Sequence, residues 1–179
     1  PLIWSNYADE PDLSGYQKLK AHADRGGQWP QWREKALAFL RESIAKEKAA
    51  ARKSVLGWST PADHSELVGI YLWEKDVESA WREAKDGNCS DDLWLKLAAL
   101  REARHPADAV SVYQNQVEAS LGQRNDLGYR HAVELLRKIR SLMTRLGRET
   151  EFARYLESVR AAHKPKRNFI KLLDRALPA

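Results

Sequence analysis

The sequence predicts an all-α fold built from antiparallel helix hairpins. Along most of the 179 residues, apolar side chains recur with the i, i+3, i+4, i+7 spacing of amphipathic helices. No segment of any length alternates apolar and polar residues with the period of two that a strand shows. Only nine glycines are present, which argues against the turn-rich Rossmann, barrel and sandwich folds.

The N-terminal region is expected to open with an irregular segment. Residues 1–12 contain two prolines, Pro1 and Pro11, and are predicted as an irregular lead-in. A first helix is expected over residues 13–25, because Leu13, Tyr16, Leu19 and Ala23 share one face. The glycine pair at residues 26–27 should end that helix.

The second predicted helix begins at Pro30, where the missing N–H of proline costs little. Its apolar face is formed by Trp32, Ala36, Phe39 and Leu40. The polar continuation over residues 46–58 is either a charged extension of this helix or a linker.

Further helices follow from capping signals and apolar stripes. Thr60 and Pro61 predict a helix start, and residues 67–73 are apolar almost all round, which indicates packing on more than one side. After a short break near residues 74–76, six further helices are expected. They are a helix through 77–84 closed by Gly87, one through 93–100, and those at 106–122, 126–146, 150–162 and 167–177.

The hairpins share an early alanine in their second helix. Ala36, Ala80, Ala109 and Ala153 are separated by 44, 29 and 44 residues, which averages near the periods of tetratricopeptide (TPR) and HEAT-like repeats but is too irregular for either consensus. An isolated hairpin would expose its apolar stripe, so stacking is expected. We therefore predict one α-helical repeat domain over residues 1–179, with the hairpins stacked as a TPR-like right-handed superhelical array.

Charge and cysteine content narrow the class of protein. Lys and Arg total 30 against 25 Asp and Glu, which gives a net charge of +5 and a pI near 9.3. The longest apolar runs fall far short of the roughly eighteen residues that a membrane span needs. The first sixteen residues, PLIWSNYADEPDLSGY, lack the regions of a secretory signal. Together with a single cysteine, these features predict a cytoplasmic protein without membrane contact.

Residues that could support catalysis are few. Cys89 precedes a helix start, where the dipole can favour a thiolate, but the neighbouring Asp91 and Asp92 oppose one. The five histidines lack the spacing of zinc ligands, and we expect ordinary surface or capping roles for them: His22, His64, His105, His131 and His163. The sequence therefore predicts neither an enzyme nor a metal or cofactor site in this chain.

A basic stripe marks the long helix at 126–146. Stepping about 100° per residue from Arg130 places Arg137, Arg145 and Arg148 within about 60° of it. Lys164, Lys166 and Arg167 add positive charge further along the chain. Such a stripe could follow phosphates, although a solvated helix face has the same pattern.

Three stretches resemble the C-terminal helical region of bacterial SWIM zinc-finger proteins. They begin GQWPQWREKALAFLRE, HSELVGIYLWEKDVESAW and YRHAVELLRKIRSLMTRL, and together they cover most of residues 27–174. In that family the zinc finger lies upstream and uses a CxC pair and a later Cys-x-His pair. Cys89 stands alone here, so the resemblance implies an accessory helical domain with zinc bound only by an upstream region.

These observations predict a non-enzymatic scaffold that binds a protein or peptide, because stacked helices form extended concave faces. The side chains expected to contact the partner are polar or aromatic and lie outside the apolar stripes: Tyr113, Asn115, Asn125, Tyr129 and Asn168. The alternative is auxiliary nucleic-acid binding through the basic residues Arg130, Arg137, Arg145, Arg148, Lys164, Lys166 and Arg167.

Overall fold

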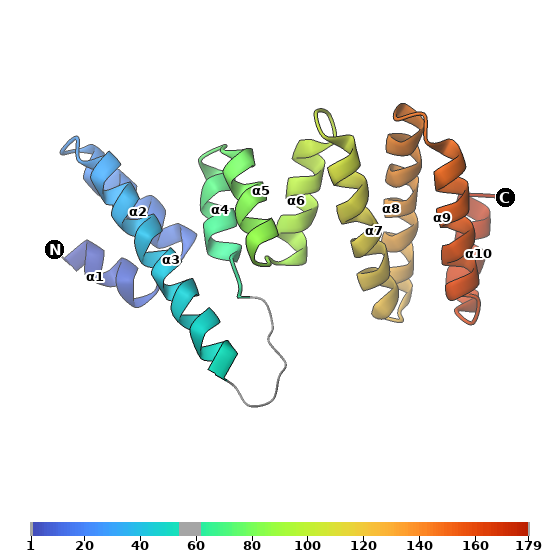
Figure 1. Ribbon diagram of the computed structural model, residues 1–179, viewed down its shortest axis with the longest axis horizontal. Helices are drawn as coiled ribbons and strands as arrows, with labels where there is room; N and C mark the ends of the chain where they lie inside the picture. The colour runs from blue at the N-terminus through green and yellow to red at the C-terminus, as the bar shows by residue number, and fades with distance from the viewer. Residues whose placement is uncertain (1, 54–61, 179) are drawn as a thin grey trace. The chain divides into compact units, whose positions relative to one another are not determined.

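The computed structural model describes residues 2–53 and 62–178 (Figure 1). Ten helices and no strand occur in these ranges, which confirms the all-α class. The chain divides into two compact units, unit 1 over Pro1–Leu93 and unit 2 over Trp94–Ala179. The single repeat domain over 1–179 stays a prediction.

Unit 1 contains five complete helices and the start of a sixth. They are α1 (Leu2–Asp9), α2 (Leu13–Asp24), α3 (Trp29–Lys53), α4 (Ser65–Trp73), α5 (Val77–Asp86) and the first residues of α6 (Asp91–Arg101). Asp12 caps α2 by accepting from the backbone N of Gly15 at 2.6 Å, and Asp76 caps α5 by accepting from Ser79 at 3.0 Å. Helix α4 packs on α5, and α2 packs on α3.

The irregular lead-in predicted for residues 1–12 is wrong for residues 2–9, which form α1. Trp4 and Tyr7 lie one turn apart and share a face of this helix. That face packs into an aromatic cluster, in which the Trp4 ring centroid lies 5.7 Å from that of Trp32 and 5.8 Å from that of Phe39. Packing among these rings stabilises α1, although the prolines that flank it in the sequence favour irregular chain.

Helix α3 shows in part whether residues 46–58 extend the second predicted helix or form a linker. It runs to Lys53, so the polar stretch from residue 46 begins as a charged helical extension. The rest of the stretch to residue 58 lies outside the described residues, as do Thr60 and Pro61 and the helix start predicted there. The described α4 begins at Ser65, after a bridge that pairs Asp63 with Asn88.

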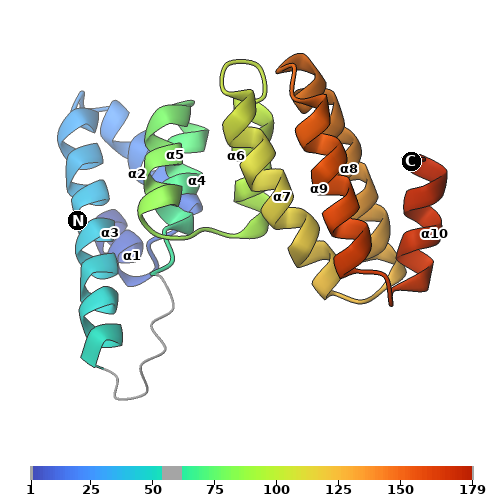
Figure 2. The ribbon, with the colours of Figure 1, turned by 45° about the vertical axis from the view of Figure 1, so that its right-hand side comes forward.

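Unit 2 follows the predicted order of helices closely. After the remainder of α6 it contains α7 (Pro106–Gly122), α8 (Asp126–Arg145), α9 (Glu149–Ala162) and α10 (Arg167–Ala176). Short turns join α7, α8 and α9, and each of these helices runs antiparallel to the one before it (Figures 1 and 2). Helix α8 packs against all of its neighbours, α7, α9 and α10, and is the centre of the unit.

The core of unit 2 lies between these helices. Leu136 and Ile139 of α8 are fully buried, as are Leu121 of α7 and Phe169 and Leu173 of α10. Because α10 contributes apolar side chains to α8 directly, its polar face is brought beside the exposed face of α8.

Candidate interaction surface

The two units carry opposite net charges. Unit 1 has 13 Lys and Arg against 16 Asp and Glu, a net charge of −3, whereas unit 2 has 17 against 9, a net charge of +8. The modest net charge of the whole chain hides this separation. A unit as basic as unit 2 attracts anionic groups, so a binding surface for an anionic partner is expected there.

One exposed face of α8 carries three arginines. Arg130, Arg137 and Arg140 are all exposed, and at about 100° per residue they lie within about 80° of one another. Two hollows in unit 2 follow this face in succession, the first beside Arg130 and Arg137 and the second beside Arg140.

The first hollow, which we name the arginine pocket, has a volume of about 260 Å³ and lies between α8 and α10. Arg137 donates from Nη1 to Oε1 of Glu134 at 2.8 Å. The side chains of Arg130 and Arg175 have no ion pair or hydrogen bond with any residue in the described parts of the chain. The lining residues come from the two helices: Arg130, Val133, Glu134, Arg137, Leu172, Arg175 and Ala176.

The second hollow, the apolar groove, has a volume of about 550 Å³ and lies between α8, α9 and the residues after α10. The buried side chains of Phe152, Leu156 and Leu177 line it. Its other lining residues are mostly polar and carry charges of both signs: Arg140, Thr144, Glu149, Ala153, Glu157, Arg160 and Pro178. Together, the arginine pocket and the apolar groove form what we call the α8 surface.

Arg160 lines the apolar groove, but its charge is already paired within the chain. Its guanidinium pairs with Asp174 of α10 and donates to the backbone oxygen of Leu177 at 2.6 Å. These contacts hold α10 and the residue after it against α9.

Two arginines of the predicted stripe, Arg145 and Arg148, line neither hollow. Arg145 is the last residue of α8 and donates to the backbone oxygen of Glu102 at 3.2 Å. Gly147, with φ of 65°, separates α8 from α9, so Arg148 occupies the N-cap position of α9 and pairs with Glu151 at 2.5 Å. The regular helical spacing that grouped Arg148 with Arg130 does not extend through this turn.

The remaining basic residues surround the turn between α9 and α10. Lys164 and Arg167 are exposed, whereas Lys166 donates from Nζ to Nδ1 of His163 at 2.8 Å. On its other side, His163 places Nε2 3.0 Å from Glu118 of α7. This histidine bridges two helices, and none of the three basic residues lines the arginine pocket.

The residues predicted to contact a protein divide by burial. Tyr113 and Tyr129 lie in the core of unit 2, where the Tyr113 hydroxyl donates to Glu102 at 2.5 Å. Asn125 is exposed and caps α8 by accepting from the backbone N of Gly128 at 2.8 Å. Asn115 and Asn168 are exposed, so they alone of the five have a side chain at the surface without a capping role.

Cys89 is poorly suited to nucleophilic chemistry. The thiol is buried, and burial together with the nearby carboxylates of Asp63 and Asp91 raises its pKa to about 12. At neutral pH it is therefore a thiol rather than a thiolate. In the described ranges, no group of three or more His, Cys, Asp or Glu side chains is placed to hold a metal ion.

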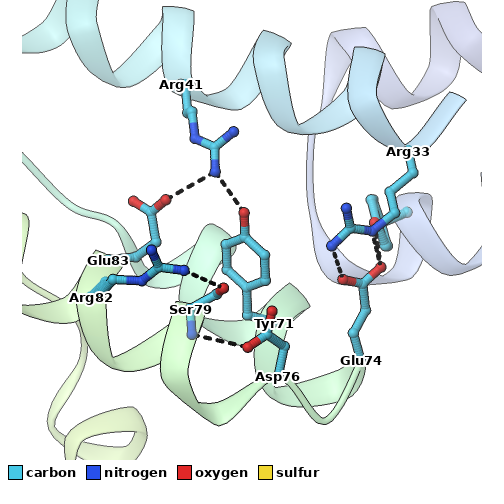
Figure 3. A network of polar contacts seen from close by, with 9 residues as sticks. Arg33, Arg41, Tyr71, Glu74, Asp76, Ser79, Arg82 and Glu83 are labelled. Carbon is cyan, nitrogen blue, oxygen red and sulfur yellow. Dashed lines mark hydrogen bonds and ion pairs between the residues drawn. The ribbon is translucent and has the colours of Figure 1, made fainter. Parts of the chain in front are cut away.

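A polar network in unit 1 joins α3 to α4 and α5 (Figure 3). Arg33 forms a bidentate ion pair with Glu74, whose nearest oxygen lies 2.6 Å from Nη2, and Tyr16 donates to the same carboxylate at 2.8 Å. Burial raises the pKa of Glu74, but these two donors outweigh it and hold the pKa below its usual range. The network contributes to the packing of the helices.

A second branch of this network reaches a buried histidine. Arg41 donates to the Tyr71 hydroxyl at 2.6 Å and lies 3.2 Å from Glu83, as Figure 3 shows. The other carboxylate oxygen of Glu83 lies 3.1 Å from Nδ1 of His64. Nε2 of His64 is buried and has no hydrogen-bond partner among the described residues. These contacts join Arg41 of α3 to Tyr71 of α4 and Glu83 of α5, and Glu83 to the residue that precedes α4.

Comparisons of the chain with protein-family models, with curated proteins and with solved structures find no match. Across the helices that the structure describes, none combines the length and apolar character needed to cross a membrane. The resemblance to SWIM zinc-finger proteins remains a prediction from the sequence.

Sequence reasoning missed how Arg175 meets Arg130 and Arg137. The signal was present in α10, where Phe169 and Leu173 occupy one face and Arg175 another. Which helix that apolar face would cover could not be deduced from its periodicity alone.

Proposed function

We propose that the chain is a non-enzymatic helical scaffold that binds an acidic segment of another protein along the α8 surface. In this proposal the hairpins within each unit stack in a right-handed, TPR-like manner. The resemblance noted above supports a role as the accessory domain of a SWIM zinc-finger protein in the cytoplasm, with zinc bound by an upstream region.

The apolar groove carries the proposal. A hollow of about 550 Å³ with Phe152, Leu156 and Leu177 along it can accept an apolar side chain of a partner. Such anchors in desolvated hollows provide much of the binding energy of protein interfaces. A nucleic-acid backbone has no comparable apolar group to place there.

The positive charge of unit 2 favours an acidic partner segment over a basic one. Unit 2 has a net charge of +8, and Arg140 at the groove has no ion pair with a described residue. Acidic residues that flank an apolar anchor would gain favourable electrostatics and faster association, whereas a basic segment would be repelled.

A peptide selection with a blocking variant tests this function. Peptides are selected from a random displayed library against the whole chain, and their affinities are measured by fluorescence polarisation. We expect acidic peptides with one apolar anchor. Ala153 is exposed and lines the groove, so Ala153→Trp should fill the groove and weaken binding at least about tenfold.

The matched control is Ala119→Trp, which changes an exposed alanine of α7 outside both hollows. It should leave the affinity within about twofold of the parent. Equal binding by the Ala153→Trp chain, or a library that yields no specific peptide, would exclude the groove as the binding site.

Auxiliary nucleic-acid binding is the second candidate, and the basic character of unit 2 favours it. The test is filter binding of single-stranded RNA at rising salt. If nucleic acid is the partner, affinity should fall steeply with salt and should depend on Arg130 and Arg137. Absence of binding at low salt would remove this candidate.

A further inference from the structure

The arginine pocket supplies a more specific recognition chemistry than the general charge of unit 2. We propose that it binds the phosphate monoester of a phosphorylated serine or threonine in the acidic partner segment. This inference rests on the proposed function, because it assigns the second contact of the same segment on the α8 surface.

The first argument is the convergence of guanidinium groups. Arg130 and Arg137 from α8 and Arg175 from α10 line one pocket of about 260 Å³. Arginine clusters recognise phosphate because the planar guanidinium donates two parallel hydrogen bonds to its oxygens. Two of the three, Arg130 and Arg175, have no partner within the described residues, so a ligand would not have to displace an existing ion pair from them.

The second argument is charge balance. Glu134 lines the same pocket and pairs with Arg137, so the three arginines and one glutamate carry a formal charge of +2. A phosphoserine carries about −1.5 to −2 at neutral pH, whereas a phosphodiester or a carboxylate carries about −1. The monoester therefore neutralises the pocket most completely.

The third argument is the apolar part of the pocket. Val133 of α8 is buried beneath the exposed arginines, and Leu172 and Ala176 of α10 are half-buried at its side. These side chains can contact the β-carbon of phosphoserine or the methyl group of phosphothreonine. Inorganic phosphate offers no such contact, so the pocket should prefer the amino-acid ester.

The spacing of the two hollows predicts a sequence pattern. The α8 residues of the arginine pocket centre near residues 133–134, and those of the apolar groove centre near residue 142. At 1.5 Å of rise per residue, the two centres lie about 13 Å apart along α8. An extended peptide advances about 3.3 Å per residue, so the apolar anchor should lie about four residues from the phosphorylated one.

The pocket can be tested without knowledge of the natural partner. The probe is N-acetyl-phosphoserine methylamide, titrated into the whole isotope-labelled chain while the arginine side-chain NMR signals are recorded. We expect saturable shifts of the Arg130, Arg137 and Arg175 signals. Arg130→Gln and Arg175→Gln should each weaken binding about tenfold, because each removes a charge-assisted contact.

Arg154→Gln is the matched control, because Arg154 is exposed on α9 and lines neither hollow. It should leave phosphoserine binding unchanged. Parallel titrations use inorganic phosphate, N-acetyl-glutamate methylamide and an oligothymidylate strand. Tighter or equal binding of any of these three, or equal losses in all three arginine variants, would overturn the proposal.

A pair of peptides separates this inference from the proposed function. Both contain phosphoserine and one leucine, placed either four residues apart or adjacent. The four-residue spacing should bind more tightly, and Ala153→Trp should remove that gain while phosphoserine binding persists. Loss of the spacing effect alone would contradict the groove, whereas binding that ignores phosphorylation would contradict the pocket.

Discussion

Replacing Gly87 with alanine is expected to destabilise unit 1 by about 3 kcal/mol. Gly87 ends α5 and faces the imidazole of His64, and an added Cβ would lie 2.1 Å from Cδ2 and 2.4 Å from Nε2 of that ring. The buried ring would have to move, which would break its 3.1 Å contact with Glu83 and disturb the adjacent bridge between Asp63 and Asn88.

Urea unfolding followed by tryptophan fluorescence measures this effect, because six of the seven tryptophans lie in unit 1. The matched control is Gly69→Ala, in the middle of α4, where nothing lies within 4 Å of the added Cβ. This control should raise the free energy of unfolding by about 0.5–1 kcal/mol through helix propensity. Equal effects of the two substitutions would contradict the close packing of Gly87 on His64.

Gly128→Ala is expected to lower the free energy of unfolding of unit 2 by about 2 kcal/mol. Gly128 lies in the first turn of α8, and an added Cβ would stand 2.4 Å from the backbone oxygen of Ser120 in α7. A backbone atom cannot rotate away as a side chain can, so the two helices would have to separate. The gain in helix propensity offsets only part of this cost.

Unfolding monitored by amide NMR signals from α7 and α8 separates this effect from unit 1. Gly122→Ala is the control, because it lies at the end of α7 with nothing within 4 Å of the added Cβ. We expect its stability to match or slightly exceed that of the parent chain. A Gly128→Ala chain as stable as the parent would show that α7 and α8 do not approach as closely as described.

Much of the helical architecture could be predicted because its signals are local. The stripe of α8, the proline that starts α7 and the glycine that follows α8 each act within a few residues, and the helices occur where these signals place them. The segment before α2 was mistaken for irregular chain because its stability comes from packing of Trp4 and Tyr7 against distant aromatic rings.

The α8 surface could be predicted only in part, because some of it depends on packing between segments that are distant in sequence. Arg130 and Arg137 share a helix, so their spacing placed them on one face. Their meeting with Arg175 depends on the packing of α10 against α8, and the groove depends on Leu177 folding back near Phe152. Conversely, Tyr113 follows Ala109 and precedes Val117 by four residues each, so the apolar stripe of α7 indicates the burial that the structure shows.

Chemical-shift mapping with the designed peptide that contains phosphoserine and a leucine four residues apart tests the central claim most directly. The whole isotope-labelled chain is titrated with the peptide, and every assigned backbone amide is followed. Binding along the α8 surface predicts shifts confined to α8 from Arg130 to Thr144, to the groove side of α9, and to residues 172–178. Shifts centred in unit 1, or on α7 away from both hollows, would show that the partner binds elsewhere and would contradict the claim.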